Sequence, residues 1–137
     1  CRHNHRQTTI LLIDIDHFKG INDTWGHDVG NEAIIAITRQ LQMTLRSGDF
    51  IGRFGGDEFA IIMSGTPAEN AIAAMSRVHE RLKKLSLPGA PSERLRISVG
   101  VAPWSTQFGH YREWLKAADI ALYKAKNAGR GRTEVAA

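Results

Sequence analysis

The sequence predicts an α/β fold in which an antiparallel-rich central sheet is flanked by helices. Apolar segments 50–51 and 59–62 surround Gly55-Gly56, and this arrangement predicts two strands joined by a tight turn, hence an antiparallel pair. Elsewhere, apolar residues recur at helical spacing, which predicts helices between the strands. The expected order is strand, helix, helix, hairpin, helix, strand, helix and short strand, which is an α/β sandwich.

Composition limits the alternatives. A length of 137 residues fits one domain over 1–137, and 42% hydrophobic residues are enough for a normal core. The net charge of +4 suits an anionic ligand, but no nucleic-acid motif accompanies it, so no nucleic-acid partner is expected. A single cysteine, Cys1, excludes an internal disulfide and indicates a reducing compartment. No apolar run approaches the ~18–20 residues of a membrane span. The polar run 1–7 is interpreted as the remnant of a linker in a longer protein.

The first half of the chain begins with a strand predicted over 8–14, because four consecutive apolar residues are typical of a buried central strand. A helix is expected from 17–23 and a glycine-punctuated loop over 26–31. A second helix follows over about 31–46, with these core-facing residues at helical spacing: Ala33, Ile34, Ile37, Leu41 and Leu45.

After the hairpin, a helix is predicted over about 67–85 and a loop over 87–92. The alternating segment 95–101 predicts a strand with one buried face. Residues 104–110 are expected to form a loop without a further assignment. The last helix is predicted over 111–127, and most of its large apolar residues are expected to face inward: Trp114, Leu115, Ala118, Ile120, Leu122 and Tyr123.

Acidic residues mark the ends of two predicted strands. The first strand ends in Asp14-Ile15-Asp16, and the hairpin turn is followed by Asp57 and Glu58. Buried carboxylates are costly unless they are paired or bind a metal, so two converging acidic strand ends predict a site for a hard cation such as Mg²⁺. A solvated hairpin would explain the turn alone, and Asp16 is interpreted as the N-cap of the following helix.

The segment Gly55-Gly56-Asp57-Glu58-Phe59, together with residues 14–27, resembles the GGDEF domain family of bacterial diguanylate cyclases. The similarity runs from about Thr9 to Arg130. The second half is also similar to enterobacterial membrane-anchored cyclases that control cellulose production. The resemblance implies a fold like the palm of nucleotide cyclases and polymerases (ferredoxin-like). It also implies an enzyme that condenses two GTP into cyclic di-GMP as a homodimer and releases two pyrophosphates.

The resemblance assigns roles to individual residues. Mg²⁺ would be held by Asp14, the Ile15 carbonyl and Asp57, and catalysis would involve Asp57, Lys19 and Glu58. Substrate would be bound by two groups of residues. The phosphates would contact His17, Phe18, Lys126 and Arg130, and the guanine would contact Asn22, His27 and Asn31. A lone lysine in a first helical turn is usually solvated, but the position of Lys19, five residues after Asp14, matches the family's phosphate-contacting lysine. The basic run 124–132 also suits a helix C-terminus.

Asn31 departs from the family pattern, which has Asp at this position. A carboxylate can accept from both N1–H and the N2 amino group of guanine, whereas an amide offers only one acceptor. The mismatch would cost about 1–3 kcal/mol in a buried site, so we expect guanine recognition to be weakened or relaxed. Alternatively, Asn31 serves as a helix N-cap.

A second, inhibitory site for the product is implied at Arg46, Asp49 and Arg77. Arginine forks bind phosphates bidentately and stack on bases, which suits cyclic di-GMP. The same Arg-Ser-Gly-Asp segment is also ordinary chemistry for the end of a helix.

Two other functions stay open. A domain with an impaired guanine pocket would act as a receptor for GTP or cyclic di-GMP, and a basic nucleic-acid binder would rest on charge alone. The resemblance further implies a cytoplasmic domain of a bacterial inner-membrane protein with a role in biofilm formation.

Overall fold

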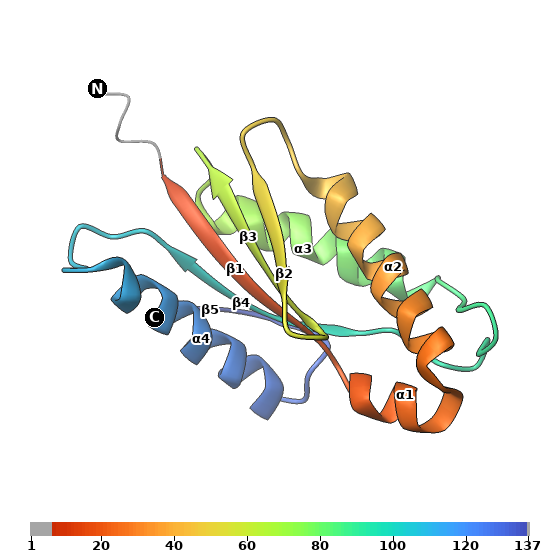
Figure 1. Cartoon of the computed structure of the whole chain (residues 1–137). Coiled ribbons are helices and arrows are strands. Elements are labelled where there is room, and N and C mark those ends of the chain that lie inside the picture. Colours follow the sequence, from red (N-terminus) through yellow and green to blue (C-terminus); the bar gives the residue numbers. More distant parts are fainter. Residues whose placement is uncertain (1–6, 137) are drawn as a thin grey trace.

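The fold is a five-stranded sheet with helices on both faces (Figure 1). The computed structural model describes residues 7–136, so residues 1–6 of the expected linker lie outside the described part. The elements follow in the predicted order: β1 (Thr8–Ile15), α1 (Phe18–Trp25), α2 (His27–Thr44), β2 (Phe50–Phe54), β3 (Glu58–Ser64), α3 (Ala68–Lys83), β4 (Ile97–Pro103), α4 (Tyr111–Asn127) and β5 (Thr133–Val135).

The sheet has the strand order β2-β3-β1-β4-β5. β1 pairs antiparallel with β3 and β4, β2 pairs antiparallel with β3, and β5 alone runs parallel to its neighbour β4. The prediction of an antiparallel-rich sheet is therefore confirmed. β1 lies at the centre, and its apolar run contributes Leu11 and Ile13 to the core.

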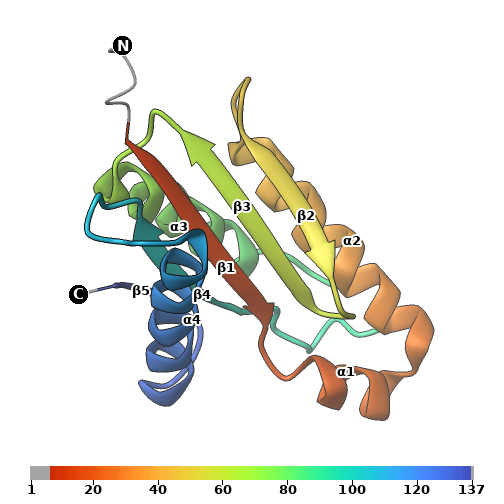
Figure 2. The ribbon, with the colours of Figure 1, turned by 60° about the vertical axis from the view of Figure 1, so that its left-hand side comes forward.

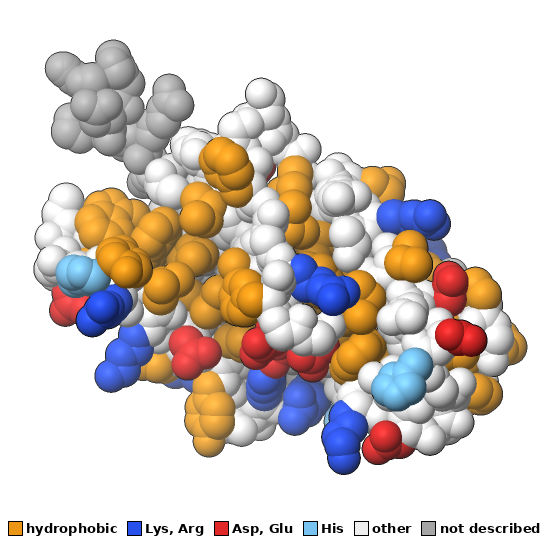
Figure 3. Space-filling view, in the orientation of Figure 1, with side chains coloured by type: hydrophobic (Ala, Val, Ile, Leu, Met, Phe, Trp, Pro, Cys, Tyr) orange, Lys and Arg blue, Asp and Glu red, His pale blue; other side chains and the backbone are white. Residues whose placement is uncertain are grey.

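The two faces of the sheet are covered unequally. α2 and α3 lie over one face, where the larger core includes Ile37, Phe59 and Met75. On the opposite face, α4 packs against β4, β1 and β5 and leaves β2 and β3 open (Figure 2). Phe50 and Phe54 of β2 consequently keep 69% and 50% of their surface exposed. Figure 3 shows hydrophobic side chains gathered on this side of the molecule.

The predicted strand over 95–101 is β4, but the prediction of one buried face is wrong. Six of its seven residues are buried, because the strand lies between α3 on one side and α4 on the other. α4 approaches closely because Gly100 has no side chain. A Cβ there would lie 2.3 Å from both the Ala118 carbonyl oxygen and the Leu122 nitrogen.

α4 has the predicted bounds but presents a different face to the sheet. Leu115, Ile120 and Tyr123 are 37%, 47% and 64% exposed, so the expectation that they face inward is wrong. The buried stripe consists mainly of alanines at helical spacing: Ala118, Ala121, Leu122 and Ala125. Small residues let the helix lie close to β4, which large apolar side chains would prevent.

α2 begins at His27, so the predicted loop over 26–31 is wrong. Gly30 is a buried helical residue, and the Asn22 side chain of α1 packs directly against it. A Cβ at Gly30 would lie only 1.8 Å from Asn22 Oδ1, so this glycine serves a close contact between α1 and α2. Within residues 7–136, none of the helices has both the length and the apolar character that a membrane span requires.

Candidate active site

The candidate active site lies where the end of β1, the β2–β3 turn and the C-terminal end of α4 meet (Figure 1). Asp14 is buried in β1 and faces Glu58, the first residue of β3, in the strand register. The Ile15 N–H donates to the Asp57 carbonyl at 3.0 Å, which fastens the turn to β1. The two predicted acidic strand ends therefore converge.

The turn depends on Gly55, whose φ of 68° lies in the left-handed region that glycine tolerates best. Gly56 follows, and a Cβ built on it would lie 3.9 Å from Phe18 Cε2. The start of α1 therefore lies beside the turn that carries Asp57 and Glu58.

The carboxylates repel one another. Burial raises the pKa of Asp57, and the charge of Asp14 raises it further. Burial likewise raises the pKa of Glu58, with contributions from Asp14 and Asp57. Lys126 opposes both shifts, and its ammonium forms an ion pair with Asp14 Oδ2. Figure 3 shows acidic side chains beside lysine and arginine at the lower end of the hairpin.

These residues fit a divalent cation. Asp14 Oδ1 is buried and has no hydrogen-bond partner within the described residues, so one oxygen of a costly buried carboxylate stays free. A cation between Asp14 and Asp57 would bind that oxygen and relieve the repulsion that raises the Asp57 pKa. Within residues 7–136, three His, Cys, Asp or Glu side chains do not gather closely enough to hold a metal by themselves. Backbone or substrate oxygens would have to complete the coordination.

Asp16 is not the N-cap of α1, and this prediction is wrong. The N-cap is His17, which has φ 56° and makes no side-chain capping bond. Asp16 is buried instead, and it accepts from Ser98 Oγ at 2.6 Å and from the Gly131 N–H at 2.7 Å. Arg130 Nη1 lies 3.8 Å from Asp16 Oδ1. Sequence reasoning missed Ser98, although a serine inside an apolar strand was an available signal.

The Lys19 side chain extends into solvent. It is 92% exposed, and its ammonium lies 3.8 Å from Asp23 Oδ2, one turn further along α1. The solvated arrangement considered from the sequence is the one observed. His17 is also exposed, whereas Phe18 is half-buried beside the turn.

The three predicted guanine-binding residues lie on the two adjoining helices α1 and α2. Asn22 packs on Gly30, and His27 and Asn31 are exposed residues one turn apart on α2. Because α2 begins at His27, Asn31 lies inside the helix and the N-cap interpretation is wrong. Asn31 lines a cavity of about 600 Å³ with Pro88 and Gly89, and neither Asn22 nor His27 contributes to its lining.

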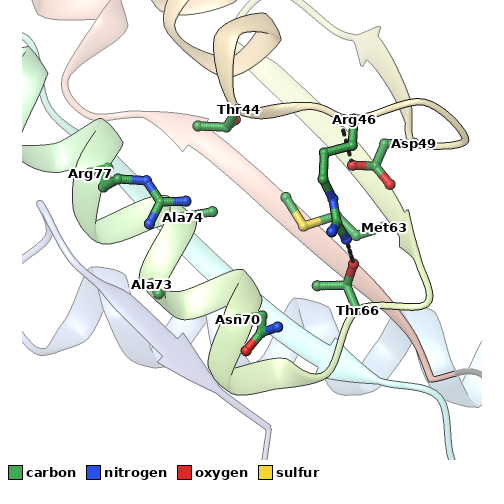
Figure 4. Close-up of a pocket in the computed structure, with 9 residues that line it drawn as sticks. All are labelled: Thr44, Arg46, Asp49, Met63, Thr66, Asn70, Ala73, Ala74 and Arg77. Atoms are coloured by element: carbon green, nitrogen blue, oxygen red, sulfur yellow. Dashed lines mark hydrogen bonds between the residues drawn. The ribbon is translucent and has the colours of Figure 1, made fainter.

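Arg46, Asp49 and Arg77 line a second cavity of about 330 Å³ (Figure 4). The Arg46 N–H donates to Asp49 Oδ2 at 2.9 Å, and Arg46 Nη2 donates to Thr66 Oγ1 at 2.6 Å. Arg77 reaches toward the same space from α3. The structure thus brings the predicted inhibitory residues together, with two guanidinium groups beside one hollow. Thr66 was not among the residues predicted for this site.

Comparisons place the chain among known proteins. The family model described as "Diguanylate cyclase, GGDEF domain" matches residues 1–132. The chain is 73% identical over its full length to the Escherichia coli K12 protein named "Probable diguanylate cyclase DgcC", and it spans 37% of that protein's length.

Two solved structures are similar throughout. The active GGEEF domain of a diguanylate cyclase from Vibrio cholerae has a TM-score of 0.91 and 29% identity, covering 99% of this chain and 86% of its own. The GGDEF domain of DgcB from Caulobacter crescentus, solved in complex with c-di-GMP, has a TM-score of 0.90 and 28% identity, covering 98% and 80%. These likenesses confirm the predicted palm-like fold.

Proposed function

Because the chain belongs to the diguanylate cyclase GGDEF-domain family, we propose that it condenses two GTP into cyclic di-GMP. The observation that carries the proposal is the cluster of Asp14, Asp57 and Glu58 beside Lys126. Such a cluster combines ligands for a metal–nucleotide complex with a cation for its phosphates.

Each 3′-hydroxyl attacks the α-phosphorus of the other nucleotide. A new P–O bond forms, the bond between the α-phosphorus and the bridging oxygen breaks, and pyrophosphate leaves. Asp57, which the turn holds beside the end of β1, accepts the hydroxyl proton. Glu58 supports the turn or contributes a further contact to the metal.

The proposed metal is Mg²⁺, held by Asp14, Asp57 and the Ile15 carbonyl. When bound, it would neutralise triphosphate charge and favour ionisation of the attacking hydroxyl. Lys126 and Arg130 would bind the β- and γ-phosphates, aided by the backbone N–H groups near His17 and Phe18. Lys19 would have to leave Asp23 to take part, because its ammonium lies in solvent in this structure.

Each chain is proposed to hold one GTP, so two chains must face each other for the reaction. A homodimer would supply both nucleotides, and activity should therefore rise more steeply than linearly with protein concentration. The cavity of Arg46, Asp49 and Arg77 is proposed to bind cyclic di-GMP and inhibit the enzyme, which its two arginines support.

The central test is product formation. The protein at high concentration should convert GTP and Mg²⁺ to cyclic di-GMP detectable by mass spectrometry, and Asp57→Ala should abolish it. Glu80→Gln removes an exposed charge distant in the chain from these residues and serves as the matched control. Equal product from Asp57→Ala would refute the assignment.

A receptor function is the second candidate, because Asn31 replaces the carboxylate that the family uses for guanine. In that case the protein would bind GTP or cyclic di-GMP without turnover. Comparison of GTP and ATP turnover in the unaltered protein and in Asn31→Asp separates the possibilities. Restored activity in Asn31→Asp would indicate a weakened enzyme, whereas equal turnover with GTP by both proteins would contradict relaxed recognition.

The wider setting is also proposed from the resemblance. The described residues would act as a single cytoplasmic catalytic domain of a longer inner-membrane protein that promotes cellulose production and biofilm formation. The chain spans 37% of the length of the curated relative it matches, and fractionation of the full-length protein would test the membrane location.

A further inference from the structure

We propose that Asp16 is a positioning residue that fixes the phosphate-binding end of α4, an inference that rests on the proposed function. The Asp16 side chain is only 1% exposed, and donors from two distant parts of the chain converge on it. Ser98 comes from β4, and Gly131 and Arg130 come from the segment after α4. A buried carboxylate with this set of partners is a structural junction between three segments.

The segment after α4 has little room to adjust. The Arg130 N–H donates to the Ala125 carbonyl at 2.9 Å and the Gly129 N–H to the Lys126 carbonyl at 3.4 Å, which is the Schellman arrangement of a helix end. Arg130 then has φ 64°, a region that non-glycine residues seldom adopt. Such a conformation persists where surrounding contacts hold it, and the bond from Gly131 N–H to Asp16 is the next contact along the chain.

Asp16 is itself held rigidly. Its N–H donates to the Arg96 carbonyl at 2.9 Å, which continues the pairing of β1 with β4 past the strand end. On the other side of Gly131, the Val99 N–H donates to the Arg132 carbonyl at 2.9 Å. The carboxylate therefore links the sheet to residues 130–132, with one oxygen bonded to Ser98 and the other to Gly131.

Two carboxylates at the end of β1 thus lie beside the two cations proposed to bind phosphate, Lys126 and Arg130. Asp14 pairs with Lys126, and Asp16 lies beside Arg130 and bonds to its neighbour Gly131. Loss of the Asp16 contacts should let Arg130 move while the rest of the nucleotide site stays intact. Loss of these contacts should therefore weaken the binding of nucleotides that carry β- and γ-phosphates. If Asp16 served stability alone, its loss would weaken the binding of all nucleotides alike.

The test compares two nucleotides by calorimetry in the presence of Mg²⁺. The first is the α,β-methylene analogue of GTP, which cannot release pyrophosphate, and the second is GMP, which lacks the β- and γ-phosphates. Asp16→Asn keeps the shape but removes the charge and leaves one accepting oxygen where the carboxylate has two, and Ser98→Ala removes one bond. We expect Asp16→Asn to lower the affinity for the triphosphate analogue about tenfold or more and the affinity for GMP less than about twofold. Ser98→Ala should lower the affinity for the triphosphate analogue by a smaller factor.

Thr9→Val is the matched control. Thr9 also makes a buried hydrogen bond from β1, 2.6 Å to the Thr66 carbonyl, but at the opposite end of the strand. It should lower thermal stability without changing the affinity ratio of the two nucleotides. An unchanged ratio in Asp16→Asn or, if that variant does not fold, in Ser98→Ala would overturn the proposal. Equal affinity of the unaltered protein for both nucleotides would overturn it too, and product formation from GTP tests the proposed function separately.

Discussion

Gly100 offers the sharpest test of how α4 is held on the sheet. In Gly100→Ala the new Cβ would lie 2.3 Å from the Ala118 carbonyl oxygen and the Leu122 nitrogen, and 2.8 Å from the Leu122 Cα. Ordinary van der Waals contacts lie at 3.4–4 Å, so α4 would have to move away from β4 by about 1 Å. The clashing atoms are helix backbone, which cannot rotate aside as a side chain can.

The expected loss of stability is about 3 kcal/mol, the upper part of the range for overpacked cores, because backbone atoms receive the methyl group. Urea unfolding followed by circular dichroism should show a midpoint lower by about 1 M or more. The displaced helix also carries Lys126, so nucleotide binding should weaken in the same variant.

Gly52→Ala is the matched control in the same sheet. A Cβ at Gly52 meets nothing within 4 Å, and alanine costs less backbone entropy than glycine, so this variant should be stabilised by up to about 1 kcal/mol. The two substitutions therefore have opposite predicted signs. A Gly100→Ala protein as stable as Gly52→Ala would refute the close packing of α4 on β4.

Three further predictions follow from other contacts. Burial lowers the pKa of His79, so stability present above about pH 6.5 should be lost as the pH falls toward the lowered pKa, and His79→Gln should flatten this decline in urea titrations at pH 7.5 and 5.5. Arg77→Ala should raise the cyclic di-GMP concentration for half-inhibition about tenfold or more, whereas Arg112→Ala, outside that cavity, should not; equal inhibition curves would exclude the cavity as the inhibitory site. Gly30→Ala should displace Asn22 and weaken GTP binding about tenfold, and unchanged affinity would show that Asn22 does not contact the base.

The sequence predicted those elements whose formation depends on residues close together in the chain. The apolar run of β1, the Gly55-Gly56 turn and the periodicity of α3 each contain their own signal, and each element forms where it was expected. The convergence of Asp14 with Glu58 followed because a hairpin and a central strand have few ways to pair.

The errors arose where partners distant in sequence decide the outcome. Gly30 indicated a loop by composition, but the contact with Asn22 makes it part of a helix. Asp16 had the sequence position of an N-cap, but its partners Ser98 and Gly131 lie 82 and 115 residues away in the chain. Similarly, the exposure of Tyr123 depends on how many strands α4 covers. The spacing of apolar residues along the helix does not predict that number.

The central position of β1 has a consequence for the order in which the molecule can assemble. Leu11 pairs with Ile61 and Val101, fifty and ninety residues further along the chain. During synthesis the central strand is therefore made before both of its neighbours, a pattern of distant contacts that slows folding relative to helical proteins. Lys126 follows later still, so a ribosome that has not yet completed α4 holds a chain whose Asp14 carboxylate has no ammonium partner.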